Sequence, residues 1–182
     1  MRQISLWLLR KHGWTVNIKN EEPPQSILCF APHTSNWDFY FGTLANWSAG
    51  RKYSFLMKKG WFFFPMRYVF SALGGIPVDR SKKTSLTQRL SEQFINKEFE
   101  HHLIIAPEGT RRRVEKWRTG FYHIALNANI PIQLAYIDYA KKEAGVLFVF
   151  YPTGNEQDDI AKIQSYYKSV TAKYPQNFYL PL

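Results

Sequence analysis

A histidine and an aspartate stand five positions apart in the stretch PHTSNWD, at residues 32–38. Residues five apart on one α-helix point about 140° apart around its axis, so these side chains meet only if His33 precedes a helix and Asp38 lies in its first turn. One ring nitrogen of His33 would then donate to the carboxylate, and the other would be free to take a proton from a substrate. A simpler interpretation is that Ser35-x-x-Asp38 is only a variant helix cap. That interpretation explains Asp38 but not the histidine.

Two further sequences carry side chains suited to binding anions. Asp79-Arg80 follows the apolar run at 75–78, and Glu108-Gly109-Thr110-Arg111 follows the apolar run at 103–106. Parallel strands place ligands at their carboxyl ends. If these runs are parallel strands, both sequences converge with the histidine and the aspartate on one edge of a sheet.

The elements that must position these residues follow from the alternation of short apolar runs with longer helical patterns. Strands are expected at 27–31, 53–57, 75–78, 103–106, 132–137 and 146–151, and helices at 37–49, 65–73, 84–100, 120–128 and 158–172. This alternation predicts an α/β fold: one three-layer domain over residues 1–182, with a mainly parallel central sheet flanked by helices. The single cysteine, Cys29, lies within the first of these strands, which predicts a buried structural thiol and a reducing compartment.

The chain carries a net charge of +10, from 24 Lys and Arg against 14 Asp and Glu. Such a balance favours anionic partners: nucleic acid, acidic lipid head groups or phosphorylated substrates. The sequence has no zinc-type Cys/His spacing, helix-turn-helix signature or RNP-type strand, so we expect no nucleic-acid partner. Aromatic residues make up 17% of the chain and are concentrated at 61–66, which favours lipid. These aromatic side chains would either line a binding site for an acyl chain or pack in the hydrophobic core.

The N-terminus is expected to form an amphipathic helix within residues 1–14. Apolar residues recur near helical spacing and are flanked by basic ones, the set being Ile4, Trp7, Leu8 and Trp14 with Arg2, Arg10 and Lys11. That pattern suits a helix lying in a membrane interface, and equally a terminal helix packed on its own domain. No stretch has the roughly 20 mostly apolar residues of a simple membrane-spanning helix.

Four blocks, in order, resemble those of the glycerophosphate and 1-acylglycerol-3-phosphate acyltransferases. PHTSNWD matches that family's His-x-x-x-x-Asp block, and GGIPVDR resembles the second block, which ends in an arginine. APEGTR is similar to the third block, and IPI at 130–132 to the fourth. The resemblance runs from about residue 27 to residue 137.

This resemblance implies catalytic roles for the first block. His33 would act as general base on an acceptor hydroxyl, and Asp38 would orient and electrostatically support the imidazole. The hydroxyl would attack a thioester carbonyl directly, without an acyl-enzyme. A well-placed general base contributes about 10²–10⁴-fold, so positioning and oxyanion stabilisation must supply the rest.

The second and third blocks would bind the acceptor. Arg80 and Arg111 are its expected anchors, because a guanidinium fork matches phosphate oxygens. Glu108 would accept from an acceptor hydroxyl or hold an arginine. Gly109 would let backbone approach the ligand, and Thr110 would offer a hydroxyl.

The function implied is that of an O-acyltransferase, peripheral at the cytoplasmic face of a membrane. It would move a fatty acyl group from acyl-CoA or acyl carrier protein to the hydroxyl of a lysolipid. The acceptor implied is one like 1-acylglycerol-3-phosphate. No metal or prosthetic group is implied, and the partners are the acyl thioester donor, the lysolipid and an anionic membrane surface. The chain is short for this family, so lyso-aminolipids and other monoacylated head groups remain open as acceptors. The alternative function is a non-catalytic, basic lipid- or membrane-binding protein.

Overall fold

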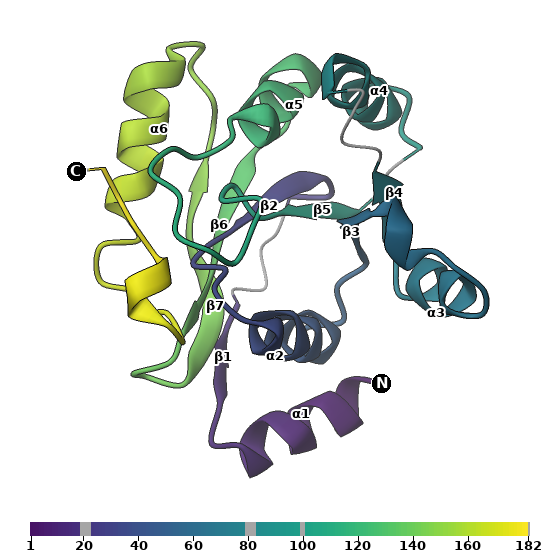
Figure 1. The fold of residues 1–182 in the computed structure, drawn as a ribbon, viewed down its shortest axis with the longest axis vertical. Helices are drawn as coiled ribbons and strands as arrows, with labels where there is room; N and C mark the ends of the chain where they lie inside the picture. Colours follow the sequence, from purple (N-terminus) through teal and green to yellow (C-terminus); the bar gives the residue numbers. More distant parts are fainter. Residues whose placement is uncertain (19–22, 79–82, 99–100, 182) are drawn as a thin grey trace.

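The computed structural model describes residues 1–18, 23–78, 83–98 and 101–181. Figure 1 shows these residues as one sheet flanked by helices. In chain order the elements are α1 (Arg2–Lys11), β1 (Thr15–Asn17), β2 (Ser26–Phe30), α2 (Asn36–Ser48), β3 (Tyr53–Lys58), the 3₁₀ helix η1 (Lys59–Trp61), α3 (Met66–Ala72), β4 (Gly75–Val78), α4 (Lys83–Ile95), β5 (His102–Ile105), α5 (Gly120–Ala128), β6 (Ile132–Asp138), β7 (Glu143–Phe150), α6 (Glu156–Ser165) and η2 (Pro175–Asn177).

The strands form a seven-stranded sheet in the order β1-β7-β6-β2-β5-β3-β4. All neighbouring pairs run parallel except β6 and β7, which are antiparallel. The central strand β2 pairs Ile27 with Leu103 of β5 on one side and with Ile132 of β6 on the other. Strands β2 to β6 therefore all end at the same side of the sheet, which we call the carboxyl edge.

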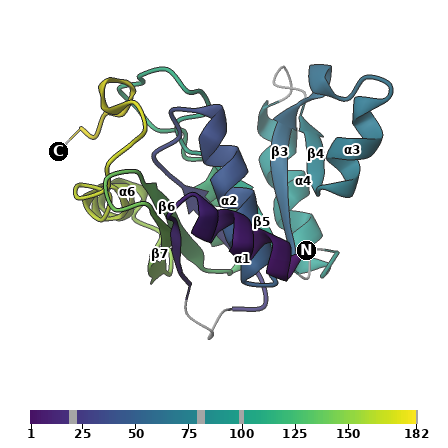
Figure 2. The same cartoon turned by 90° about the horizontal axis from the view of Figure 1, so that it is seen from below.

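Helices cover both faces of the sheet, which makes three layers. The larger core joins the sheet to α4, α5 and α6 and includes Leu90, Phe121 and Ile163. The smaller core joins the opposite face to α1 and α2 and includes Leu9 and Phe41. Figure 2, seen from below, shows α1 lying across α2, with α3 beside β3 and β4 at one end of the sheet. The structure confirms the predicted fold class, an α/β domain with a mainly parallel sheet and an N-terminal helix.

Two predicted helices are too long. The fourth helix was expected to reach residue 100 but ends at Ile95, where Lys97 adopts a left-handed backbone with φ of 57°. Two histidines at the start of β5 follow this helix: His101 forms a hydrogen bond with Ser54, and His102 forms one with Ser26. The last helix was expected to reach residue 172 but ends at Ser165. Tyr167, Val170 and Ala172 beyond it are buried, and the Tyr167 hydroxyl donates to the carbonyl of Cys29 in β2.

The N-terminal helix packs on its own domain and also keeps an exposed apolar side. Leu9 is buried against α2, while Ile4 and Trp7 are exposed. Trp14, expected to insert into a membrane, is buried and stacks on Phe41 with ring centroids 4.3 Å apart. It lies beyond the end of α1, just before β1, a three-residue strand that the sequence did not predict. Within the described residues, no helix is long and apolar enough to cross a bilayer.

Candidate active site

The turn between β2 and α2 holds the first motif at the carboxyl edge. Ser35 is the N-cap of α2, and its hydroxyl accepts from the Trp37 N–H at 3.1 Å. Asp38 completes a capping box, because its Oδ2 accepts from the backbone N–H groups of Ser35 and Thr34, each at 2.7 Å. The helix-cap interpretation of Ser35-x-x-Asp38 is thus correct. The same hydrogen bonds hold the buried carboxylate of Asp38 in place beside His33.

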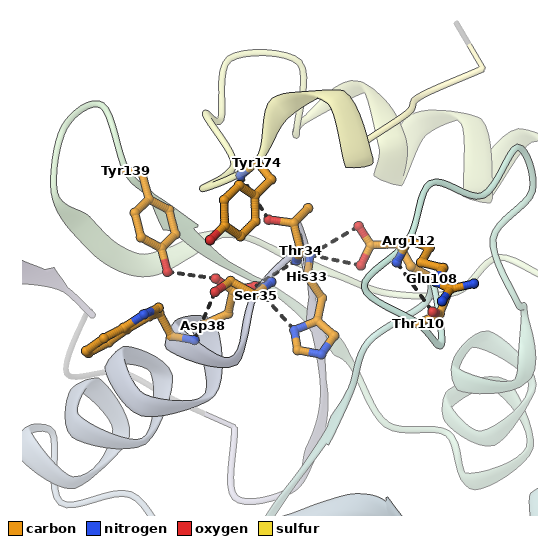
Figure 3. A network of polar contacts seen from close by, with 10 residues as sticks. His33, Thr34, Ser35, Asp38, Glu108, Thr110, Arg112, Tyr139 and Tyr174 are labelled. Carbon is orange, nitrogen blue, oxygen red and sulfur yellow. Dashed lines mark hydrogen bonds and ion pairs between the residues drawn. The ribbon is translucent and has the colours of Figure 1, made fainter.

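The ring of His33 lies against that carboxylate. Its Nδ1 is 3.4 Å from Oδ2 of Asp38, and the side chains are 26% and 1% exposed. This separation is within ion-pair range, but the buried Nδ1 makes no hydrogen bond of regular geometry with any described residue. The predicted ring-to-carboxylate hydrogen bond is therefore not formed here, and Oδ2 accepts two backbone N–H groups. Figure 3 shows the second ring nitrogen of His33 pointing away from Asp38.

A tyrosine that the sequence analysis missed holds the other oxygen of Asp38. The hydroxyl of Tyr139 donates to Oδ1 at 2.7 Å. Burial, together with the hydrogen bond and charge of Asp38, keeps the pKa of Tyr139 well above its ordinary value, so the phenol stays a donor. Tyr139 directly follows β6 and so lies at the carboxyl edge. The rule that placed His33 and Glu108 at this edge would have identified it.

Glu108 contacts the backbone of the histidine rather than an arginine. Its two carboxylate oxygens accept from the His33 N–H at 3.1 and 2.9 Å, joining the turn after β5 to the turn after β2. The side chain is buried, and burial raises the pKa of Glu108 from 4.5 to about 8. The His33 N–H lowers this pKa, and the negative charge of Asp38 raises it. The first and third motifs therefore meet at the carboxyl edge, as expected, through the backbone of His33 and the side chain of Glu108 (Figure 3).

The remainder of the third motif forms a tight turn under a basic side chain. Gly109 has φ of 65°, and a Cβ there would lie 2.9 Å from Nε of Arg118. The backbone N–H of Arg118 donates to the Pro107 carbonyl at 2.8 Å, which holds that residue over the turn. The left-handed backbone conformation therefore favours glycine, and a larger residue would also displace the side chain of Arg118. Thr110 accepts from the Arg112 N–H at 3.4 Å.

Arg111 is exposed beside this turn and makes no hydrogen bond or ion pair with any described residue. Arg80, the other expected anchor, lies outside the described residues. The fourth motif is not at the site. Pro131 accepts from the Ile27 N–H at 3.0 Å, at the start of β2 and β6, which is the opposite edge of the sheet.

The C-terminal segment also reaches the site, as the sequence did not indicate. The backbone N–H of Tyr174 donates to the Thr34 hydroxyl at 3.3 Å. The ammonium of Lys173 lies over the rings of Trp37 and Tyr139, 5.4 and 5.3 Å from their centroids. These contacts tie residues 173–174 to the turn that carries His33.

Comparisons with known proteins bear on the fold and on the family of this chain. The chain is similar in structure to PlsC, the 1-acyl-sn-glycerophosphate (LPA) acyltransferase from Thermotoga maritima, with a TM-score of 0.64 and 14% identity over 90% of this chain and 73% of that one. No significant match is found among curated protein sequences. A family model described as Acyltransferase matches residues 15–138, which include the turns of His33 and Glu108. This match spans well over half of the chain, and the protein therefore belongs to the Acyltransferase family.

Proposed function

We propose that this protein is an O-acyltransferase that moves a fatty acyl group from an acyl thioester to the hydroxyl of a lysolipid. The observation that carries the proposal is the ring of His33 against the buried carboxylate of Asp38, at the carboxyl edge of a family-assigned acyltransferase fold. Tyr139 and two backbone N–H groups hold that carboxylate in place. A fixed negative charge beside an imidazole suits general-base catalysis, because it stabilises the imidazolium that forms during proton transfer.

In the proposed reaction, the second ring nitrogen of His33 takes the proton of the acceptor hydroxyl as its oxygen attacks the thioester carbonyl. The C–O bond forms, the C–S bond breaks, and the thiolate leaves with the proton returned by the imidazolium. The nitrogen facing Asp38 stays protonated throughout. Hydrogen bonds to the histidine commonly tighten when substrate binds, so the 3.4 Å separation is compatible with this role.

Glu108 has a positioning role in this proposal, different from the role that the family resemblance implied. Its carboxyl group bonds the backbone of His33 and so fixes the turn that carries the base. Direct contact between Glu108 and the acceptor is not part of the proposal. Arg111 is exposed at the same turn and is the proposed contact for an anionic acceptor head group, jointly with Arg80. Gly109 and Thr110 shape this turn.

The proposed donor is acyl-CoA or acyl carrier protein, and the first acceptor to test is 1-acylglycerol-3-phosphate. No metal or prosthetic group enters the proposed steps. The net charge of +10 supports attachment to the anionic cytoplasmic surface of a membrane, since basic residues are attracted to acidic lipids. Ile4 and Trp7 of α1 are exposed and available for such contact.

The test is incubation of the purified full chain with several acyl thioesters and a panel of lysolipids, read by mass spectrometry. The panel contains lysophosphatidate, lysophospholipids with zwitterionic head groups and lyso-aminolipids. We expect a diacylated product with at least one pair, and none with His33→Ala. If no pair yields product while the chain still binds vesicles, the non-catalytic lipid-binding function is correct instead.

A further inference from the structure

An exposed aromatic segment follows β3 and is not used by the proposed chemistry. We call residues 58–69 the aromatic tip; they comprise the end of β3, η1 and the first half of α3. Its outward apolar side chains, with their exposed fractions, are Trp61 (54%), Phe63 (55%), Phe64 (77%), Tyr68 (58%) and Val69 (47%). Isolated exposed apolar residues are ordinary, but a run of large ones marks an interaction surface.

Three of the exposed rings of the tip contact a neighbouring aromatic ring. Phe64 and Tyr68 meet edge to face with centroids 6.2 Å apart, and Trp61 meets Phe70 in the same way at 6.5 Å. The guanidinium of Arg67 lies 4.6 Å from the centroid of the Tyr68 ring. Trp61, Phe64 and Tyr68 are therefore each supported by a neighbouring ring.

The charged side chains within the tip are all positive. Lys58, Lys59 and Arg67 are exposed within the tip. No Asp or Glu occurs in the sequence from residue 39 to residue 78. Aromatic residues interleaved with cations, free of acidic residues, are complementary to an anionic lipid surface, where rings enter the head-group layer and cations remain among the phosphates.

The topology places the tip on the same edge as the active site. β3 is parallel to β5, and β5 is parallel to β2, so Lys58 and the turn of His33 lie at the same ends of their strands. One strand, β5, separates β3 from β2. With about 4.8 Å between neighbouring strands, the lateral separation of the two strands is about 10 Å. That distance is within the length of one lipid molecule.

We propose that the aromatic tip inserts into an anionic bilayer surface and holds the carboxyl edge, with His33, against the lipid that carries the acceptor. The occupant of this surface is a membrane, because charge complementarity and the shared edge both select it. The inference deepens the proposed function by stating how a lipid acceptor reaches the base. α1, with its exposed Ile4 and Trp7, is the competing attachment site, but this helix packs with α2 on one face of the sheet rather than at the carboxyl edge.

Single-site labelling tests the insertion directly. The only cysteine, Cys29, is 0% exposed, and burial raises the pKa of its thiol, so an introduced cysteine is the one that a thiol reagent modifies in the folded protein. The variants are Phe64→Cys in the tip, Ile4→Cys in α1 and Tyr151→Cys as the control. Tyr151 is 68% exposed and follows β7, whose end pairs with the start of β6 at the opposite edge. Each carries an environment-sensitive nitrobenzoxadiazole dye.

The labelled proteins are mixed with vesicles of phosphatidylcholine alone or of equal parts phosphatidylcholine and phosphatidylglycerol. We expect the emission at position 64 to rise and shift to the blue with the anionic vesicles only, while position 151 stays unchanged. A response at position 4 without one at position 64 overturns the proposal in favour of α1. Unchanged emission at position 64 with both vesicle types also overturns it.

Phe64→Ser and Tyr151→Ser then separate docking from chemistry. Removing one inserted ring should weaken partition onto anionic vesicles about five-fold, and Tyr151→Ser should leave it unchanged. Phe64→Ser should retain wild-type turnover of a short-chain, freely soluble acceptor while losing turnover of vesicle-embedded acceptor. Equal partition of the two variants overturns the docking inference, whereas failure of wild type to acylate any acceptor overturns the proposed function and leaves the vesicle measurements standing.

Discussion

Replacing Glu108 by glutamine should stabilise the protein at alkaline pH, because the buried carboxyl group costs folding free energy once it ionises. Burial raises the pKa of Glu108 from 4.5 to about 8. Between these values the folded protein retains a proton that the unfolded chain has lost, so the contribution of Glu108 to stability is fully present below pH 4.5 and disappears as the pH rises through about 8. Glutamine stays neutral throughout and keeps an oxygen that can accept from the His33 N–H.

The magnitude follows from the same pKa values. The difference between 4.5 and about 8 corresponds to about 5 kcal/mol at about 1.36 kcal/mol per pH unit. Between about pH 5 and pH 8.5, the free energy of unfolding of wild type relative to Glu108→Gln should therefore fall by about 4 kcal/mol. Taking the difference between two proteins cancels the titration of every other group.

Urea unfolding of both proteins across this pH range provides the measurement. Glu115→Gln is the matched control, because Glu115 is an exposed acidic residue on the same loop and undergoes the same change of side chain. If the difference for Glu108→Gln changes by less than about 1 kcal/mol over the range, the carboxyl group is ionised at neutral pH and the reasoning from burial is wrong.

Three further substitutions test the contacts around the site. Tyr139→Phe removes a hydrogen bond to the buried aspartate and should lower kcat about ten-fold with little change in KM, as steady-state kinetics would show; an unchanged kcat would contradict its positioning role. Arg111→Ala should raise KM for an anionic acceptor and leave KM for the thioester unchanged, with Arg112→Ala as the neighbouring control; equal changes for both substrates would assign Arg111 to the donor. Gly109→Ala should lower the free energy of unfolding by about 1–3 kcal/mol, as measured by chemical denaturation. The loss should exceed that of Gly50→Ala, since Gly50 shares a positive φ but has open space around it. Equal losses would mean that crowding at position 109 is unimportant.

Sequence reasoning located the turn of His33 at the carboxyl edge because its signals are local. The order of strands and helices follows from periodicity, and the rule that ligands bind at the ends of parallel strands then brings His33 and Glu108 together. The hydrogen-bond partners of the individual side chains do not follow from that rule. Glu108 bonds a backbone N–H, and Oδ2 of Asp38 accepts two of them, because the turn has buried donors that must be satisfied.

Long-range packing explains the remaining differences. Trp14 has a helical spacing to Trp7, but helix α1 ends before it, and its ring is buried against Phe41. Tyr139 and Tyr174 are more than 100 residues from the turn that they support. The strand-end rule places Tyr139 at the carboxyl edge but does not identify Asp38 as its partner, and nothing near Tyr174 in the sequence indicates its contact. Arg80 stays a prediction, since it lies outside the described residues.

The rate of acyl transfer by purified His33→Ala, compared with wild type on the acceptor identified by the lysolipid panel, tests the central claim most directly. Because the ring is only partly buried, circular dichroism and the urea midpoint should match wild type, which separates chemistry from folding. The account predicts a loss of about 10²–10⁴-fold in kcat/KM, as expected when a general base is removed. A folded His33→Ala protein whose kcat/KM stays within about two-fold of wild type would contradict the assignment of His33 as the base.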